Sequence, residues 1–113
     1  MKLGVIGSRT LIDEEIVFQV LDSMKVQISA IITGGAKGAD QFAEKWAIKN
    51  NIPTIIYLPD WANDGKSAAM RRNRQIAKDC EECLAFWDGI SKGTKSTIEM
   101  CQKLDKKVRI ISL

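Results

Sequence analysis

Short apolar runs alternate along this chain with stretches in which apolar residues recur every three or four positions. The runs predict five β-strands, at residues 2–7, 30–33, 53–58, 82–87 and 107–112. The periodic stretches predict four α-helices, at residues 13–24, 40–50, 68–78 and 94–104. Residues 59–67 are polar and turn-prone.

The predicted strands are apolar throughout rather than alternating, which is typical of strands that are buried on both faces. Strands that alternate with helices indicate a parallel sheet. We therefore expect residues 1–113 to form a single doubly wound, Rossmann-like α/β domain. Its five-stranded parallel sheet should have the order 3-2-1-4-5, with helices on both faces. Ligands of such folds bind beyond the carboxyl ends of the strands, where the strand order reverses.

Three loops that follow predicted strands carry glycine and polar residues suited to an anion. Glycine lets a ligand approach the backbone closely, and a helix N-terminus offers N–H donors and a partial positive charge. We expect these loops to bind a phosphorylated ligand through the following candidate residues: Gly7, Ser8, Arg9, Gly34, Gly35, Lys37, Gly38, Asp40, Asp88, Ser91, Lys92, Gly93 and Thr94.

Each loop also has a plain structural interpretation. The first, taken alone, is better explained by an ordinary strand-to-helix turn, since turns prefer glycine and serine. Asp40 is a natural N-cap for the helix it begins, and Thr94 could cap its helix or bind a phosphate. The glycine pattern of residues 34–38 matches neither the Walker A loop nor the GxGxxG fingerprint. A P-loop NTPase and a dinucleotide dehydrogenase are therefore not supported.

Three arginines lie close together in the helix predicted at residues 68–78. Arg71 and Arg74 are three positions apart and share a helix face, so we expect both to neutralise ligand charge while Arg72 points elsewhere. The alternative is a solvated surface. Trp61, in the polar stretch before this helix, could stack on a base or simply close the loop.

Composition narrows the chemistry that this chain can perform. It has no histidine, which excludes His-dependent catalytic triads and His-based zinc sites within one chain. No metal or cofactor is predicted, and the net charge of +3 allows an anionic partner. Three cysteines indicate a reducing cytoplasm, and we interpret the CxxC of Cys80 and Cys83 as structural or incidental. No apolar run is long enough to span a membrane, and the N-terminus lacks a signal-peptide pattern.

Four blocks of the sequence, taken in order, resemble the SLOG superfamily. They are residues 5–9, 33–40, 71–77 and 91–94, and the resemblance extends over nearly the whole chain. This superfamily unites the Rossmann-like core of the DNA-processing protein A family with the LOG-type nucleotide phosphoribohydrolases. The subgroup that this sequence resembles most is that of the small stand-alone YspA-like proteins.

The resemblance implies a ligand class but leaves catalysis open. Members of the superfamily bind nucleotides, nucleotide-derived ligands or single-stranded DNA on the loop face. LOG-type hydrolases carry a Pro-Gly-Gly-x-Gly-Thr-x-x-Glu motif with a catalytic glutamate, whose position is occupied here by Thr97. Glu99 lies two residues later, about 200° further round the helix, and we expect it to point away from the site.

We therefore expect a domain that binds a nucleotide or a nucleotide-derived phosphorylated ligand, as a sensor or a minor processing enzyme. The alternatives are single-stranded nucleic-acid binding through the same basic face, weak nucleotide phosphoribohydrolase activity, and a dimeric interaction module. The sequence leaves open whether the chain forms homo-oligomers.

Overall fold

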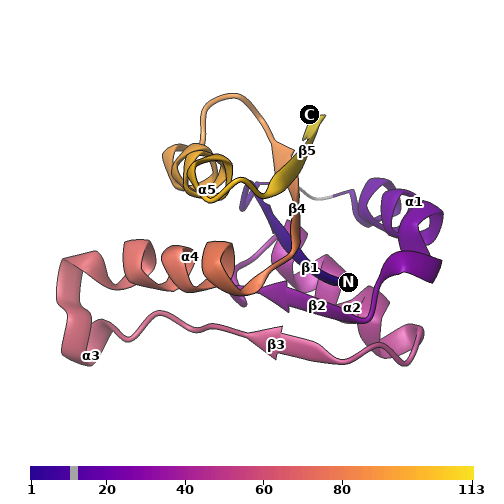
Figure 1. Cartoon of the computed structure of the whole chain (residues 1–113), viewed down its shortest axis with the longest axis horizontal. Helices are drawn as coiled ribbons and strands as arrows, with labels where there is room; N and C mark the ends of the chain where they lie inside the picture. Colours follow the sequence, from indigo (N-terminus) through magenta and orange to yellow (C-terminus); the bar gives the residue numbers. More distant parts are fainter. Residues whose placement is uncertain (11–12) are drawn as a thin grey trace.

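Five parallel strands form the sheet in the order β3-β2-β1-β4-β5 in the computed structural model, which describes residues 1–10 and 13–113 (Figure 1). The strands are β1 (Lys2–Gly7), β2 (Ala30–Thr33), β3 (Thr54–Ile56), β4 (Glu82–Trp87) and β5 (Lys107–Ser112). The predicted fold class and strand order are confirmed. β3 is shorter than the predicted run of residues 53–58, in part because Pro53 has no N–H to donate to its neighbour.

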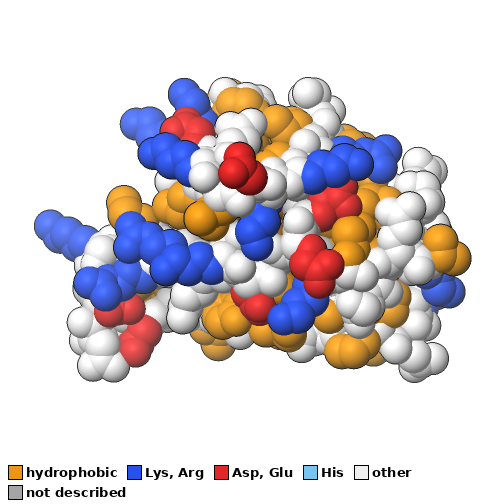
Figure 2. Space-filling model, viewed as in Figure 1, with side chains coloured by type: hydrophobic (Ala, Val, Ile, Leu, Met, Phe, Trp, Pro, Cys, Tyr) orange, Lys and Arg blue, Asp and Glu red, His pale blue; other side chains and the backbone are white. Residues whose placement is uncertain are grey.

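Helices cover both faces of the sheet, with α1 and α2 on one side and α4 and α5 on the other (Figure 1). The helices are α1 (Glu14–Met24), η1 (Lys25–Gln27), α2 (Ala39–Lys49), α3 (Trp61–Asp64), η2 (Gly65–Ser67), α4 (Ala68–Asp79) and α5 (Lys92–Lys103). The short α3 lies in the stretch predicted only as turn-prone, and the Asp60 side chain caps it by accepting the N–H of Asn63. Lys and Arg side chains gather over α4 on the face shown in Figure 2.

The core has two layers because successive side chains of each strand point to opposite faces of the sheet. In β1, Leu3 and Val5 pack under α1 and α2, whereas Ile6 packs toward α4 and α5. Trp46 of α2 fills the first layer, and its indole N–H donates to Asp22 of α1 across 2.8 Å. None of the described helices is long and apolar enough to cross a bilayer.

The three cysteines belong to the second layer. Cys80, Cys83 and Cys101 are free thiols and fully buried between the sheet and the pair α4 and α5. A hydrogen bond with Cys101, together with burial, raises the pKa of the Cys80 thiol above its ordinary value. The three side chains pack as core residues, and no metal-binding group of three His, Cys, Asp or Glu side chains occurs among residues 1–10 and 13–113.

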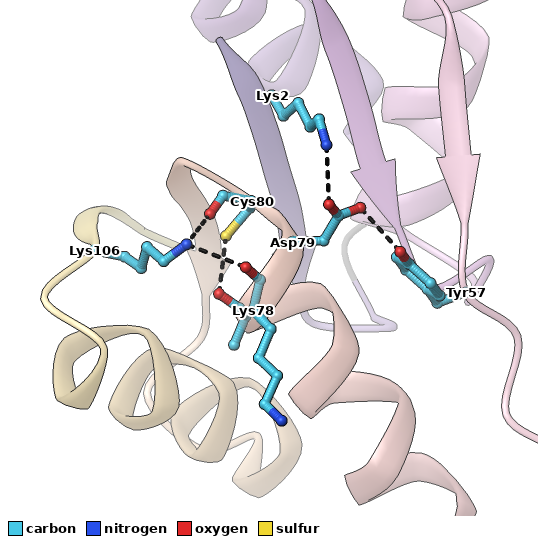
Figure 3. A network of polar contacts seen from close by, with 7 residues as sticks. Lys2, Tyr57, Lys78, Asp79, Cys80 and Lys106 are labelled. Atoms are coloured by element: carbon cyan, nitrogen blue, oxygen red, sulfur yellow. Dashed lines mark hydrogen bonds and ion pairs between the residues drawn. The ribbon is translucent and has the colours of Figure 1, made fainter.

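A polar network holds the C-terminal end of α4 against the sheet (Figure 3). The Asp79 carboxylate accepts from the ammonium of Lys2 at 3.0 Å and from the hydroxyl of Tyr57 at 2.9 Å. Lys106 donates to the carbonyl oxygens of Lys78 and Cys80. The negative end of the helix dipole favours a cation at this position. Because this end of α4 is held beside the start of β1, its first turns lie toward the opposite edge, where the strands end.

Candidate ligand-binding site

A cavity of about 390 Å³ opens beyond the carboxyl ends of β1 and β4, where the strand order reverses. Four segments form its wall: the loops after β1, β2 and β4, and the side of α4 that faces the sheet, with the first turns of α5 continuing the β4 loop. The lining residues are Ile6, Gly7, Ser8, Arg9, Thr10, Ala36, Asp40, Ala69, Arg72, Asn73, Ile76, Asp88, Ser91, Gly93, Thr94 and Thr97.

The cavity brings together about half of the residues predicted from the sequence. Those that line it are Gly7, Ser8, Arg9, Asp40, Asp88, Ser91, Gly93 and Thr94. The predicted residues that do not line it are Gly34, Gly35, Lys37, Gly38, Arg71, Arg74 and Lys92. Six of these seven residues lie in the loop after β2 or on α4, so the structure differs from the prediction mainly in these two segments.

The first three N–H groups of the glycine loop after β2 are directed at the protein itself. Asp40 Oδ2 accepts from the N–H of Gly34 at 3.0 Å and from the N–H of Ala36 at 3.2 Å. The N–H of Gly35 reaches Thr33 Oγ1 at 3.4 Å. Asp40 consequently is not the N-cap of α2, a position that Gly38 occupies, because its carboxylate turns back to hold the loop.

Close packing explains why this loop needs glycine at two positions. A Cβ on Gly38, which has φ +81°, would lie 2.5 Å from the carbonyl oxygen of Ser8. A Cβ on Gly34 would overlap the guanidinium of Arg72. The glycines thus let the loops after β1 and β2 and the helix α4 approach one another, which the sequence pattern alone does not distinguish from the approach of a ligand.

Of the three arginines of α4, Arg72 is the one that lines the cavity, so the expectation that Arg71 and Arg74 would do so was wrong. Arg72 is 7% exposed. Its Nη1 donates to the carbonyl oxygen of Gly34 at 2.6 Å, and its Nε donates to Asn73 Oδ1 at 2.7 Å. Arg71 and Arg74 do share a face, but it is the outer face of α4, where they line a separate hollow.

The buried stripe of α4 determines which arginine turns inward. Ala68, Arg72 and Ile76 are spaced by four residues and all are buried, so they lie one above the other on a single face. This signal is present in the sequence, because Arg72 is four positions from an apolar residue on either side. Asn73, one position further on, lines the same cavity and was also missed.

Asp40 is a buried residue whose carboxyl group belongs to the cavity lining. Burial raises its pKa from 3.8 to about 6, against the opposing effects of the Ala36 and Gly34 hydrogen bonds and the charge of Arg72. Both hydrogen bonds fall on Oδ2, and Oδ1 has no protein partner among the described residues. A carboxyl whose pKa lies near neutrality can exchange a proton with a bound molecule.

The loop after β4 is held by its own side chains and presents the start of α5. Asp88 Oδ1 accepts the N–H groups of Ile90 and Ser91, both at 2.8 Å, and these bonds lower the pKa of Asp88. Ser91 is the N-cap of α5 and accepts the N–H of Thr94, so Thr94 is not the cap. Across the crevice, Ser8 Oγ accepts the N–H of Asp88 at 3.3 Å.

Two residues decide how the last loop compares with a hydrolase motif. Thr97 lines the cavity, and its hydroxyl donates to the carbonyl oxygen of Gly93 at 2.9 Å. Glu99 is exposed and does not line the cavity, as the helix geometry predicts. Among the described residues of the cavity, the carboxyl groups are therefore those of Asp40 and Asp88.

Sequence comparison connects the chain to one family. The model of the YspA, cpYpsA-related SLOG family matches residues 1–63, which include β1, β2 and β3. The Gene 61 protein of Mycobacterium phage D29 is 34% identical over 79 residues, which are 65% of this chain and 63% of the phage protein. The match thus spans less than two thirds of that relative.

Two solved structures share the fold. DNA processing protein A from Streptococcus pneumoniae superposes with a TM-score of 0.83 and 22% identity, covering 99% of this chain and 50% of that chain. DNA processing protein A from Helicobacter pylori, described as having a unique single-stranded DNA binding mode, gives a TM-score of 0.81 at 18% identity. That match covers 100% of this chain and 66% of the H. pylori chain.

Proposed function

The chain belongs to the YspA, cpYpsA-related SLOG family, and we propose that residues 1–113 act as one domain whose cavity binds a nucleotide or a nucleotide-derived phosphorylated ligand. The observation that carries this proposal is the guanidinium of Arg72, which is buried at the wall of a cavity at the sheet's reversal point. A buried cation beside a cavity is suited to a charged hydrogen bond with an anionic ligand.

The phosphate in this proposal lies at the N-terminus of α5, between Gly93 and the loop after β1. Gly93 is open to the cavity, because a Cβ placed on it meets no atom within 4 Å. Ser8, Arg9 and Thr94 supply side-chain donors around that position, and the helix dipole favours the negative charge. The Ile6 and Ile76 side chains offer an apolar wall for the rest of the ligand.

Carboxylates in the same cavity favour a nucleotide over a simple anion. Asp40 and Asp88 would repel inorganic phosphate, but they can accept hydrogen bonds from sugar hydroxyls or from the amino group of a base. A ligand that combines an anionic group with hydrogen-bond donors therefore suits this wall. We propose binding, as in a sensor, as the main role, and slow nucleotide hydrolysis as a subsidiary one.

A second candidate is a single-stranded nucleic acid held through the same cavity face. It is supported by the shared fold with the H. pylori protein described as binding single-stranded DNA and by the net charge of +3. The two candidates differ in salt response, because a strand that neutralises several phosphates gives a steep dependence of affinity on salt. Three free thiols suit a reducing compartment, and we propose the cytoplasm.

Native mass spectrometry of freshly purified protein tests the main proposal. We expect a co-purified mass that matches a nucleotide or a derivative, and its release on denaturation. Calorimetric titration with a nucleotide panel should then give saturable binding that Ser8→Ala weakens, while Ser29→Ala, a serine on the loop before β2, leaves it unchanged. Absence of binding to every nucleotide in the panel, together with no co-purified ligand, would contradict the proposal.

A further inference from the structure

The outer face of α4 forms a second, basic hollow that is separate from the cavity. Arg71, Arg74, Gln75 and Lys78 line it together with Asp64 of α3, and its volume is about 260 Å³. It has no residue in common with the cavity lining. Figure 2 shows Lys and Arg side chains gathered over this helix.

The positive charge of this hollow is largely uncompensated. Arg71 Nε lies 3.7 Å from Asp64 Oδ1, while its side chain stays 63% exposed. Within residues 1–10 and 13–113, no carboxylate lies within 4 Å of the charged groups of Arg74 or Lys78. The three cations are spaced by three and four residues, so they form a stripe about 10 Å long on one face.

An exposed indole is carried by α3, the short helix that also supplies Asp64 to the hollow. Trp61 is 56% exposed, whereas Trp46 is 1% exposed and the indole N–H of Trp87 is bonded to Ser91. Trp61 and Asp64 are three positions apart in α3 and therefore share a face, and Asp64 contacts Arg71. Trp61 thus belongs to the same short helix as Asp64, the residue that contacts Arg71 at the start of the cationic stripe.

We propose that the outer face of α4 is a second binding site, which takes the phosphodiester backbone of a single-stranded nucleic acid and stacks a base on Trp61. Successive phosphates of a flexible strand can each meet one cation of the stripe, and every base has a flat face that stacks on an aromatic ring. The Asp and Glu side chains of an acidic peptide would satisfy the cations but carry no aromatic ring for the indole, whereas every nucleotide carries both groups. The site goes beyond the nucleotide cavity and does not depend on it.

Fluorescence anisotropy with a labelled oligothymidylate tests the site. The double variant Arg71→Gln/Arg74→Gln should weaken binding about tenfold. It should also reduce the slope of log affinity against log salt by about 1.4, because each phosphate that a cation neutralises on a single strand adds about 0.7 to that slope. The matched control Lys25→Gln/Lys103→Gln removes two exposed lysines from other helices and should leave the affinity within about twofold. Denaturation midpoints of both variants establish that they are folded.

Two further measurements separate this site from the alternatives. Oligothymidylate should quench the exposed Trp61, and Trp61→Leu should abolish the quenching and weaken binding. Asp64→Asn, which releases Arg71, should tighten binding, whereas Glu99→Gln on α5 should not. Nucleotide affinity in the cavity should be the same in Arg71→Gln/Arg74→Gln as in the unmodified protein.

Three results would overturn the proposal. One is no measurable oligothymidylate binding at low salt. This result would contradict the site on α4 but not the proposed nucleotide binding in the cavity. Another is binding that depends on Ser8 but not on Arg71 and Arg74, which would place the strand in the cavity. The third is displacement of the strand by poly-glutamate as effectively as by unlabelled oligothymidylate, with no change in Trp61 fluorescence, which would indicate an acidic protein partner.

Discussion

Arg72 Nη1 donates a 2.6 Å hydrogen bond to the carbonyl oxygen of Gly34, a residue 38 positions away along the chain. The N–H of the same glycine donates to Asp40 Oδ2 at 3.0 Å. Gly34 is therefore held on both sides, by a cation from α4 and by a carboxylate from α2. The contact joins the loop after β2 to α4 and places both charged side chains at the cavity wall.

This contact predicts that Gly34→Ala destabilises the protein. The added methyl group would overlap the Arg72 guanidinium, which is held in place by its own hydrogen bonds. Overpacking of this kind costs about 1–3 kcal/mol in the free energy of unfolding, measurable by urea denaturation. Gly93→Ala is the matched control, since its methyl group meets no atom within 4 Å and lies in α5. We expect that substitution to stabilise the protein by about 0.5–1 kcal/mol, and equal effects of the two would contradict the prediction.

Replacement of single arginines should separate the two faces of α4. We expect Arg72→Ala to weaken nucleotide binding by about 1.5–3 kcal/mol, the range for hydrogen bonds to charged groups. Arg74→Ala should leave nucleotide binding unchanged, because Arg74 lines the outer hollow. Calorimetric titration measures both, under conditions where the denaturation curve of Arg72→Ala shows a folded protein. Weaker nucleotide binding by Arg74→Ala alone would reverse the assignment of the faces.

The buried Asp40 carboxyl predicts an unusual dependence of stability on pH. Its pKa is about 6 in the folded protein and 3.8 as an ordinary aspartate, so between these values the folded state binds more protons than the unfolded state. Raising the pH through this window therefore lowers the free energy of unfolding, by at most about 3 kcal/mol. The side chain in Asp40→Asn cannot ionise, so this variant should lose none of this free energy of unfolding.

Urea denaturation of both proteins at pH 4 and pH 7 isolates this contribution. The stability of Asp40→Asn relative to the unmodified protein should increase between the two pH values. Carboxylates with lowered pKa, such as Asp79 and Asp88, contribute in the opposite direction, but equally in both proteins. A stability difference that does not change with pH would show that Asp40 titrates normally.

The sheet could be predicted from the sequence because each strand and helix is indicated by residues that are close together in the chain. Each strand is a short apolar run, and runs that alternate with helices leave few parallel arrangements. The three loops at one edge follow from the same topology, since the carboxyl ends of parallel strands share an edge. The differences are the short helix α3, which lies in a stretch predicted only as turn-prone, and element boundaries. For example, α5 begins two residues earlier than predicted because Ser91 caps it.

The partners of the loop residues could not be predicted, because they come from distant segments. Glycines that permit close approach look the same in the sequence whether a phosphate or Arg72 fills the space. Asp40 at a helix start looks like a cap, although its carboxylate bonds the preceding loop. The inward face of α4 is different, because its signal is local: Arg72 lies four positions from Ala68 and from Ile76, which are both buried.

The cavity lining also predicts how well the protein could catalyse nucleotide hydrolysis. At the position of a LOG-type glutamate, Thr97 donates its hydroxyl to Gly93 and cannot serve as a general acid. Asp88 has a lowered pKa and two backbone hydrogen bonds on one oxygen, which suits a carboxylate that stays ionised. Asp40, which lines the cavity and has a pKa of about 6, is the better candidate for proton transfer.

We therefore expect release of base from nucleoside monophosphates to be slow or undetectable, while binding persists. Any residual rate should fall in Asp40→Asn by about 10²–10⁴, the usual contribution of general acid–base catalysis. Chromatography of a nucleotide panel incubated with the protein measures the released base, with Glu99→Gln as the control for an exposed carboxylate. Turnover near the enzyme median of about 10 s⁻¹ would contradict a binding role. In that event, a rate unchanged by Asp40→Asn would transfer the acid–base assignment to Asp88.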